Sequence, residues 1–132
     1  METKFNFKSS VCTSRSQSER LLSLGLKKET ADMHHYLWSE GFWDIQACPP
    51  RGNSSSFIPA WSLHRLIEMM PTMIKRWNQD WELSINGAGV IYFRKDTTAI
   101  IEALANNVYD NMISIIEWLI MEGYFNKEYL EG

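Results

Sequence analysis

The chain has 132 residues, of which 45% are hydrophobic, 13% aromatic and 22% charged, so intrinsic disorder is excluded and one globular domain over 1–132 is expected. Thirteen basic and sixteen acidic residues give a formal charge of -3, which excludes a broad cationic surface for nucleic acid. Two cysteines outside any CxxC or CxxH spacing exclude a zinc or redox motif, and no apolar run approaches the ~18 residues of a membrane span. We therefore expect a reduced, cytoplasmic protein.

The start of the chain contains one predicted helix. Residues 1–13 carry no clear period and are interpreted as an ordered edge or a loose arm. Ser16 and Glu19 have the spacing of a capping box, in which each side chain bonds the backbone of the other residue. They predict a helix over 17–24, and Gly25 suits its left-handed end.

A hairpin and a loop are expected next. Residues 31–38 and 42–46 are rich in aromatic and mixed side chains, and a short link with Gly41 separates them. This pattern indicates two antiparallel strands. Residues 47–57 include paired prolines and a cluster of Gly, Asn and Ser, so they are interpreted as a surface loop rather than a domain linker.

The middle of the chain predicts a second helix. Pro59 suits a helix start, and apolar residues recur at helical spacing from Trp61 to Met70. Pro71 interrupts this pattern, and residues 73–77 are expected to add another turn before the chain reverses.

Alternating apolar residues predict a β-hairpin over 81–93. Asn86 and Gly87 lie between its two apolar runs and favour a type I′ turn, because both residues tolerate positive φ. Residues 98–105 allow two interpretations: their Ala, Leu and Glu favour a helix, whereas a third strand would make the sheet more self-sufficient. We favour the strand.

A long helix is predicted from residue 107 to Gly123, because its apolar residues follow helical spacing and Asn106 or Asn107 can cap its start. Strands joined by short turns pair antiparallel, and the helices between them gather on one face of the sheet. The sequence therefore predicts an α+β fold: a small antiparallel sheet of four to five strands with about three helices packed mainly on one face.

The histidines are the first candidates for catalysis or metal binding. On a strand, His34 and His35 point to opposite faces and cannot chelate one ion together, whereas Asp32 and His34 share a face. His64 lies in the predicted second helix, and Ser62 faces another direction there. No residue is therefore assigned as catalytic, cofactor-binding or metal-binding, which favours a non-enzyme.

Two surfaces are candidates for binding a partner. Trp38 and Trp43 belong to the predicted short hairpin, one face of which is expected to be exposed. The second candidate is an electronegative surface on the last predicted strand and helix, formed by Glu102, Asp110, Glu117 and Glu122. The core is expected to contain Trp61, Trp81 and Trp118.

Nucleic acid is not expected as a partner, and neither is a membrane. Binding of a single strand needs aromatic residues interleaved with cations. The second half of the chain offers two short basic pairs, Lys75 with Arg76 beside Trp77, and Arg94 with Lys95, among ten acidic residues.

Several segments occur together in this chain: SQSERLLSLGL at 16–26, TADM at 30–33, IPAWSL at 58–63 with LIEMMP at 66–71, and IEWL at 116–119 followed by Gly123 and Tyr124. In this combination, which spans most of 16–125, the chain resembles short uncharacterised proteins of gut anaerobic bacteria and their prophages or mobile elements. The resemblance implies a cytoplasmic accessory protein of mobile DNA, a setting in which small binding modules are common. It carries no assigned activity and no catalytic residues.

These patterns favour a non-enzymatic interaction module that binds a protein partner or a second copy of itself as a homodimer. Two alternatives stay open. One is a small enzyme with a site near His34, His64 and the loop after Cys48, and the other is an acidic decoy that engages a nucleic-acid-binding protein. No cofactor is expected.

Overall fold

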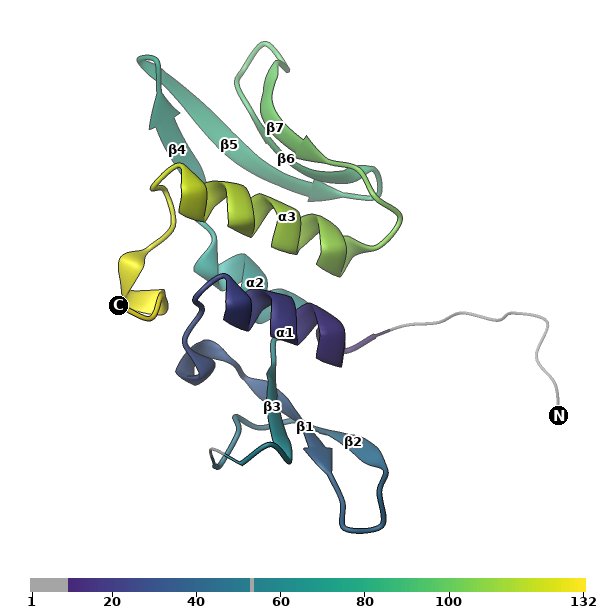
Figure 1. Ribbon diagram of the computed structural model, residues 1–132. Coiled ribbons are helices and arrows are strands. Elements are labelled where there is room, and N and C mark those ends of the chain that lie inside the picture. The colour runs from purple at the N-terminus through teal and green to yellow at the C-terminus, as the bar shows by residue number, and fades with distance from the viewer. Residues whose placement is uncertain (1–9, 53) are drawn as a thin grey trace, which may run out of the picture.

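The longest helix, α3 (Val108–Met121), lies between the two halves of the molecule (Figure 1). It belongs to a computed structural model that describes residues 10–52 and 54–132. Asn107 caps the helix by accepting from the N–H groups of Tyr109 and Asp110, which confirms the predicted start. Seven side chains are buried over a wide arc of the helix, namely Tyr109, Asn111, Met112, Ile113, Ile115, Ile116 and Leu119. Such an arc requires cover on more than one side.

A four-stranded antiparallel sheet covers one side of α3. It consists of β4 (Met73–Arg76), β5 (Gln79–Asn86), β6 (Gly89–Phe93) and β7 (Ala99–Ala103), in that order. Side chains at alternate positions turn toward the helix and are buried, among them Ile74, Trp81, Val90 and Tyr92. The hairpin over 81–93 and the strand interpretation of 98–105 are therefore confirmed.

The expected helical turn over 73–77 is wrong, because these residues form β4 and the turn that follows it. Ile74 lies opposite Trp81 in the ladder, and both side chains are buried. This contact between two strands outweighs the local helical spacing. The type I′ geometry also occurs here: Trp77 (φ 54°) and Asn78 (φ 60°) are the two turn residues between β4 and β5.

The turn between β5 and β6 differs from the predicted one. Asn86 pairs with Gly89, so Gly87 and Ala88 form the connection, and neither has a positive φ. The Asn86 side chain instead accepts from the Ala88 N–H at 2.8 Å. Gly89 allows a close approach of the strands, since a Cβ there would lie 2.2 Å from the Ala103 carbonyl oxygen.

A separate three-stranded antiparallel sheet forms the other end of the molecule. Its order is β2-β1-β3, with β1 (Met33–Leu37), β2 (Trp43–Gln46) and β3 (Phe57–Ala60). The predicted hairpin is confirmed, but the predicted helix start at Pro59 is wrong, because Pro59 lies within β3. It is tolerated there since β3 is an edge strand. Helix α2 (Leu63–Met69) begins only after Ser62, whose hydroxyl accepts from the Arg65 N–H.

Helix α1 (Arg15–Ser23) packs between α3 and β3. The capping box is formed by Ser14 and Gln17, so the prediction of Ser16 and Glu19 is wrong by two residues. Gly25 (φ 101°) ends the helix as predicted. The N–H of Leu26, the residue after Gly25, donates to the Leu21 carbonyl and completes a Schellman motif.

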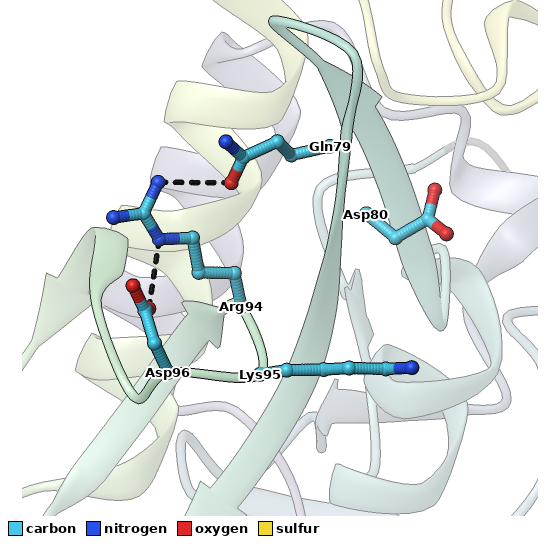
Figure 2. A pocket seen from close by; sticks show the side chains of 5 residues that line it. All are labelled: Gln79, Asp80, Arg94, Lys95 and Asp96. Atoms are coloured by element: carbon cyan, nitrogen blue, oxygen red, sulfur yellow. Dashed lines mark hydrogen bonds and ion pairs between the residues drawn. The ribbon is translucent and has the colours of Figure 1, made fainter.

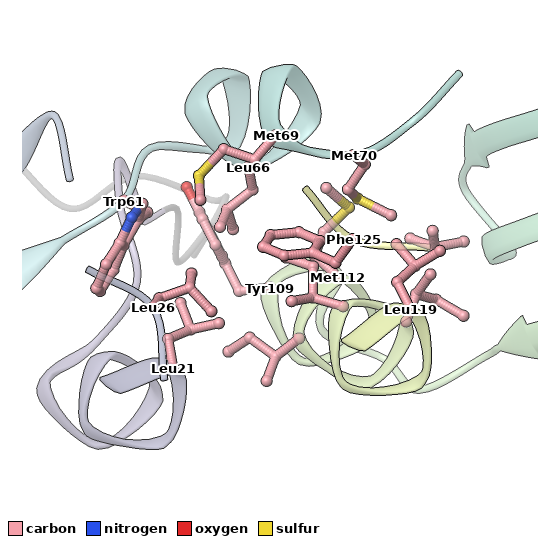
Figure 3. Close-up of a cluster of buried hydrophobic side chains, with 14 of the residues drawn as sticks. Leu21, Leu26, Trp61, Leu66, Met69, Met70, Tyr109, Met112, Leu119 and Phe125 are labelled. Carbon is pink, nitrogen blue, oxygen red and sulfur yellow. The ribbon is translucent and has the colours of Figure 1, made fainter. Parts of the chain in front are cut away.

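The core is continuous through the three helices (Figure 3). Trp61 is fully buried and Trp81 is 2% exposed, as expected, whereas Trp118 is half-buried against the ring of Tyr92. Residues near the two ends of the sequence also meet. Two short 3-10 helices, Lys28–Thr30 and Lys127–Tyr129, flank a bridge between Leu26 and Leu130.

The predicted α+β class is confirmed. The described residues contain seven strands in two sheets, where the sequence indicated four to five strands, and the helices lie between the sheets (Figure 1). Residues 1–9 of the predicted arm lie outside the described part, whereas Cys12 and Thr13 are buried and the Thr13 N–H bonds the Trp61 carbonyl. Residues 47–52 and 54–56 lie outside helices and strands, as expected of a loop, whereas Phe57 belongs to β3.

The location of the capping box is testable with two serines. Ser14→Ala should lower the free energy of unfolding by about 1 kcal/mol, because it leaves an N–H of the first turn without its partner. Ser16→Ala should change it by less than about 0.5 kcal/mol, since Ser16 lies on the exposed helix surface. Urea denaturation followed by circular dichroism measures both. Equal effects, or a larger effect at Ser16, would contradict the assignment.

Candidate functional site

Five aromatic side chains form a continuous row on the outer face of the three-stranded sheet. His34 and Tyr36 alternate along β1 and share this face, and Trp38, directly after the end of β1, continues the alternation. Phe57 of β3 lies opposite Tyr36, with its ring centroid 5.0 Å from Tyr36 and 5.5 Å from His34. Trp38 meets Tyr36 edge-on at 4.9 Å and stacks on Phe42 at 6.2 Å. We call these five residues the aromatic row.

Exposure increases along the aromatic row. At its inner end His34 is buried, and its Nδ1–H donates to the Cys48 carbonyl at 2.8 Å. The loop after Cys48 also covers Phe57, because Gly52 lies against that ring. At the outer end Trp38 is 41% and Phe42 is 54% exposed. This end belongs to the β1–β2 hairpin, which projects away from α3 (Figure 1).

The opposite face of the same hairpin is used within the chain. The His35 Nε2–H donates to the Thr13 carbonyl at 2.8 Å. Trp43 lies opposite Leu37 in the ladder, is half-buried, and carries the Arg15 guanidinium 4.7 Å above its ring. The structure thus separates the two predicted partner-binding tryptophans. Trp38 is on the open face, whereas Trp43 is on the face turned toward α1.

The free edge of β2 is occupied by its own side chains. Asp44 accepts from the Ile45 N–H at 2.9 Å and from the Gln46 amide at 3.1 Å. An edge N–H that is already bonded offers less to an added strand, and a charged residue there opposes edge pairing. The hairpin therefore presents its ring-bearing face rather than its edge.

The four predicted acidic residues have different surroundings. Gln17 of α1 donates to Asp110 at 2.9 Å. Arg20 forms an ion pair with Glu117 at 2.7 Å, and Arg76 of β4 forms one with Glu122 at 3.2 Å. Glu102 is exposed on β7, a separate element. Three of the four carboxylates are therefore bonded within the chain.

The residues considered for catalysis are not brought together. Asp32 accepts from the Ser62 N–H at 2.9 Å and from its hydroxyl at 2.5 Å, so it fixes the start of α2. His34 bonds a carbonyl instead of Asp32, and the exposed His64 lies 3.6 Å from Glu68. Among residues 10–52 and 54–132, no group of three or more His, Cys, Asp or Glu side chains has the arrangement of a metal site.

Sequence reasoning identified Trp38 but missed the rest of the aromatic row. Tyr36 and His34 precede Trp38 at a period of two, which is the available signal for a shared strand face. Phe42 follows the turn. Phe57 had no such signal, because it was assigned to a loop and joins the row only through its register with Tyr36.

No protein-family model matches this chain, and the same is true of curated proteins and of solved structures. Within the part of the chain that the structure describes, no helix combines the length and apolar character needed to span a bilayer.

The two cysteines should react at different rates. Burial, together with the charge of Asp32, raises the pKa of the Cys12 thiol to about 11, whereas Cys48 is half-exposed in the loop. At about pH 8, iodoacetamide should therefore alkylate Cys48 well before Cys12, because the thiolate is the reacting form. Mass spectrometry of peptides locates the label. In denaturant both should react alike, and equal rates in the folded protein would contradict the burial of Cys12.

Proposed function

We propose that this chain is a non-enzymatic interaction module that binds a protein partner through the outer half of the aromatic row. The observation that carries the proposal is the contact series from Tyr36 through Trp38 to Phe42. Its last two rings are 41% and 54% exposed although they touch each other. Exposed aromatic side chains that support one another are typical anchors of protein interfaces, because they bury a large area with little loss of side-chain entropy.

The hairpin is a better candidate than the acidic part of α3. Asp110, Glu117 and Glu122 are held by partners in the chain, so a basic protein would have to compete with those bonds. Among the residues that the structure describes, the rings of Trp38 and Phe42 have aromatic contacts only within the row. Binding there removes apolar surface from water without breaking an ion pair.

The surroundings of the rings favour a partner segment that carries Lys or Arg beside an apolar side chain. Glu40 lies in the turn next to Trp38 and Phe42, and Asp44 shares the face of Tyr36. Electron-rich rings flanked by carboxylates attract cations by cation–π and Coulomb interactions. Since the β2 edge is blocked by Asp44, the partner is expected to lie across the rings rather than add a strand.

The resemblance to short proteins of gut anaerobic bacteria and their mobile elements supports a proposal for the biological context of this module. We propose a cytoplasmic accessory protein of a phage or mobile element, whose partner is a protein of the host or of the element. A second copy of the chain is the other occupant of the same surface. It would form a homodimer through Trp38 and Phe42.

The proposal predicts a loss of partner binding on replacing one ring. Trp38→Ser and Phe42→Ser should each weaken binding of a captured partner by more than tenfold, as expected for interface anchors worth roughly 2 kcal/mol. The measurement is affinity capture from host lysate followed by titration of the retained protein. Trp77→Ser is the matched control, because it removes an equally large exposed ring at the other end of the molecule.

The same variants separate the two occupants. Sedimentation of the purified chain should show a monomer if the partner is another protein. A dimer that Trp38→Ser converts to monomer would identify a second copy. The proposal would be overturned if Trp38→Ser and Phe42→Ser capture the same proteins as the unmodified chain and have the same mass in sedimentation.

A further inference from the structure

Strand β7 forms one edge of the four-stranded sheet, and its outer side is open. It pairs with β6 on one side only. Alternate residues of a strand direct their N–H and C=O groups to opposite sides, so β7 also presents such groups away from β6. Among the residues that the structure describes, no loop, turn or side chain donates to or accepts from the backbone of Ala99–Ala103. We call this open side the β7 edge.

The other three sheet edges are less able to accept a further strand. In β2 the Asp44 side chain bonds an edge N–H, β3 contains Pro59, which has no N–H, and β4 carries the exposed Lys75. β7 has the sequence AIIEA, with neither Pro nor Lys. Its bulge against β6, between Tyr92 and Phe93, lies near the start of β7. The rest of the β7 edge is regular and can pair with a strand.

The chain directly after β7 is fixed by a buried side chain of α3. The Asn111 amide donates to the Ala105 carbonyl at 2.9 Å and accepts from the Ala105 N–H at 2.7 Å. These bonds hold the backbone next to Leu104, which is 54% exposed. The Leu104 side chain lies over Gly89, since a Cβ there would lie 2.7 Å from Leu104 Cδ2. An apolar side chain is therefore held in place at the end of the β7 edge.

A hollow lies beside the β7 edge on the outer face of the sheet. Val90 and Tyr92 of β6 are buried on the side of α3, so Ile91 and Phe93 point to the outer face. Glu102 lies opposite Ile91 in the ladder and shares that face. The hollow has a volume of about 260 Å3 and is lined by Ser84, Ile91, Phe93, Thr97, Ala99 and Glu102.

The carboxylate of Glu102 favours a cation on an added strand. Glu102 is exposed and forms no ion pair with any residue that the structure describes. In the turn before β7, Asp96 bonds Arg94 at 2.7 Å, and Lys95 projects away from both (Figure 2). This turn lies at the other end of β7 from Glu102. Glu82 of β5 adds a second negative charge to the outer face.

We propose that the β7 edge binds an extended segment of a partner protein, in which Lys or Arg is flanked at the second residue on each side by an apolar side chain. The segment adds a strand to β7 and bonds its backbone. Its cation lies opposite Glu102, and its apolar side chains contact the hollow and Leu104, because alternate residues share a face. A second copy fits this edge less well, because antiparallel pairing of β7 with itself about Glu102 sets two carboxylates opposite each other.

Fluorescence anisotropy of a labelled peptide with the core Val-Thr-Lys-Thr-Val tests the proposal. Glu102→Gln should weaken binding about two- to fivefold, the expected loss of one exposed cross-strand ion pair. Glu82→Gln is the matched control: it removes the same charge from the same face, but two strands away from the β7 edge, so it should have a smaller effect. Replacing the Lys of the peptide by Glu should weaken binding further than Glu102→Gln does.

Two measurements identify the mode of binding. A peptide N-methylated at the residues that face β7 cannot donate to the strand and should not bind. Hydrogen exchange followed by NMR should show that the unmodified peptide slows exchange of the open β7 amides. Trp38→Ser should bind the peptide as the unmodified chain does. A failure at β7 therefore leaves the hairpin proposal standing, and the reverse also holds.

Four outcomes would overturn the proposal for the β7 edge. The first is a peptide that shows no change in anisotropy at the highest soluble protein concentration in low salt. The second is equal binding of the N-methylated peptide. The third is an equal effect of Glu82→Gln and Glu102→Gln in variants that melt as the unmodified protein does. The fourth is a chain that sediments as a dimer with its β7 amides already protected, because a second copy would then occupy the edge.

Discussion

The burial of α3 on two sides is the constraint on which the rest of the structure depends. Its buried arc includes Ile113 and Ile116 and is too wide for one sheet or one neighbouring helix to cover. The four-stranded sheet covers one side, and α1 packs on another. Each sheet is small, and among the described residues no helix covers its outer face. One cluster of buried residues joins the four-stranded sheet to the helices and to Trp61 at the end of β3.

This arrangement also explains where the candidate surfaces are. The helices and the inner faces of the sheets supply most of the core, so their side chains are committed to packing. Trp38 in the β1–β2 hairpin is 41% exposed, and Trp77 in the β4–β5 turn is 68% exposed. Tyr36 and Phe42 contact the ring of Trp38, whereas Trp77 packs against Arg76 and against the buried Trp81.

Features that depend on neighbouring residues were predictable from the sequence. Gly25 at a helix end, Asn107 at a helix start and the alternation over 81–93 each have a local physical cause. β4 was missed because Ile74 is placed by its contact with Trp81, which spacing within 73–77 does not reveal.

Two further errors have the same origin in distant contacts. Ser14 and Ser16 both fit the capping-box spacing, and the choice between them accompanies a bond from Gln17 to Asp110 of α3. Pro59 suits a helix start in isolation, yet its place opposite His34 puts it in a strand.

The candidate surfaces were predictable only in part. Alternation along β1 separates His34 from His35, and the structure places them on opposite faces, each bonded to a carbonyl group. The sequence did not show whether Trp38 and Trp43 lie on the same face of the hairpin, because the register of the turn between them decides which residues share a face. The basic pairs at Lys75 and Lys95 were visible as isolated dipeptides, and only the order of the whole sheet places both pairs at the same end of it.

The bridge between Leu26 and Leu130 bears on how the chain folds during synthesis. The N–H of Lys27 bonds the Tyr129 carbonyl, and the N–H of Glu131 bonds the Gly25 carbonyl. The segment after α1 therefore cannot form this bridge until residues 126–131 have been synthesised, and α1 waits for α3 as well. Until then α1 has only part of its native cover, that from β3, so the apolar side that packs on α3 stays exposed in the growing chain, where it is open to chaperones.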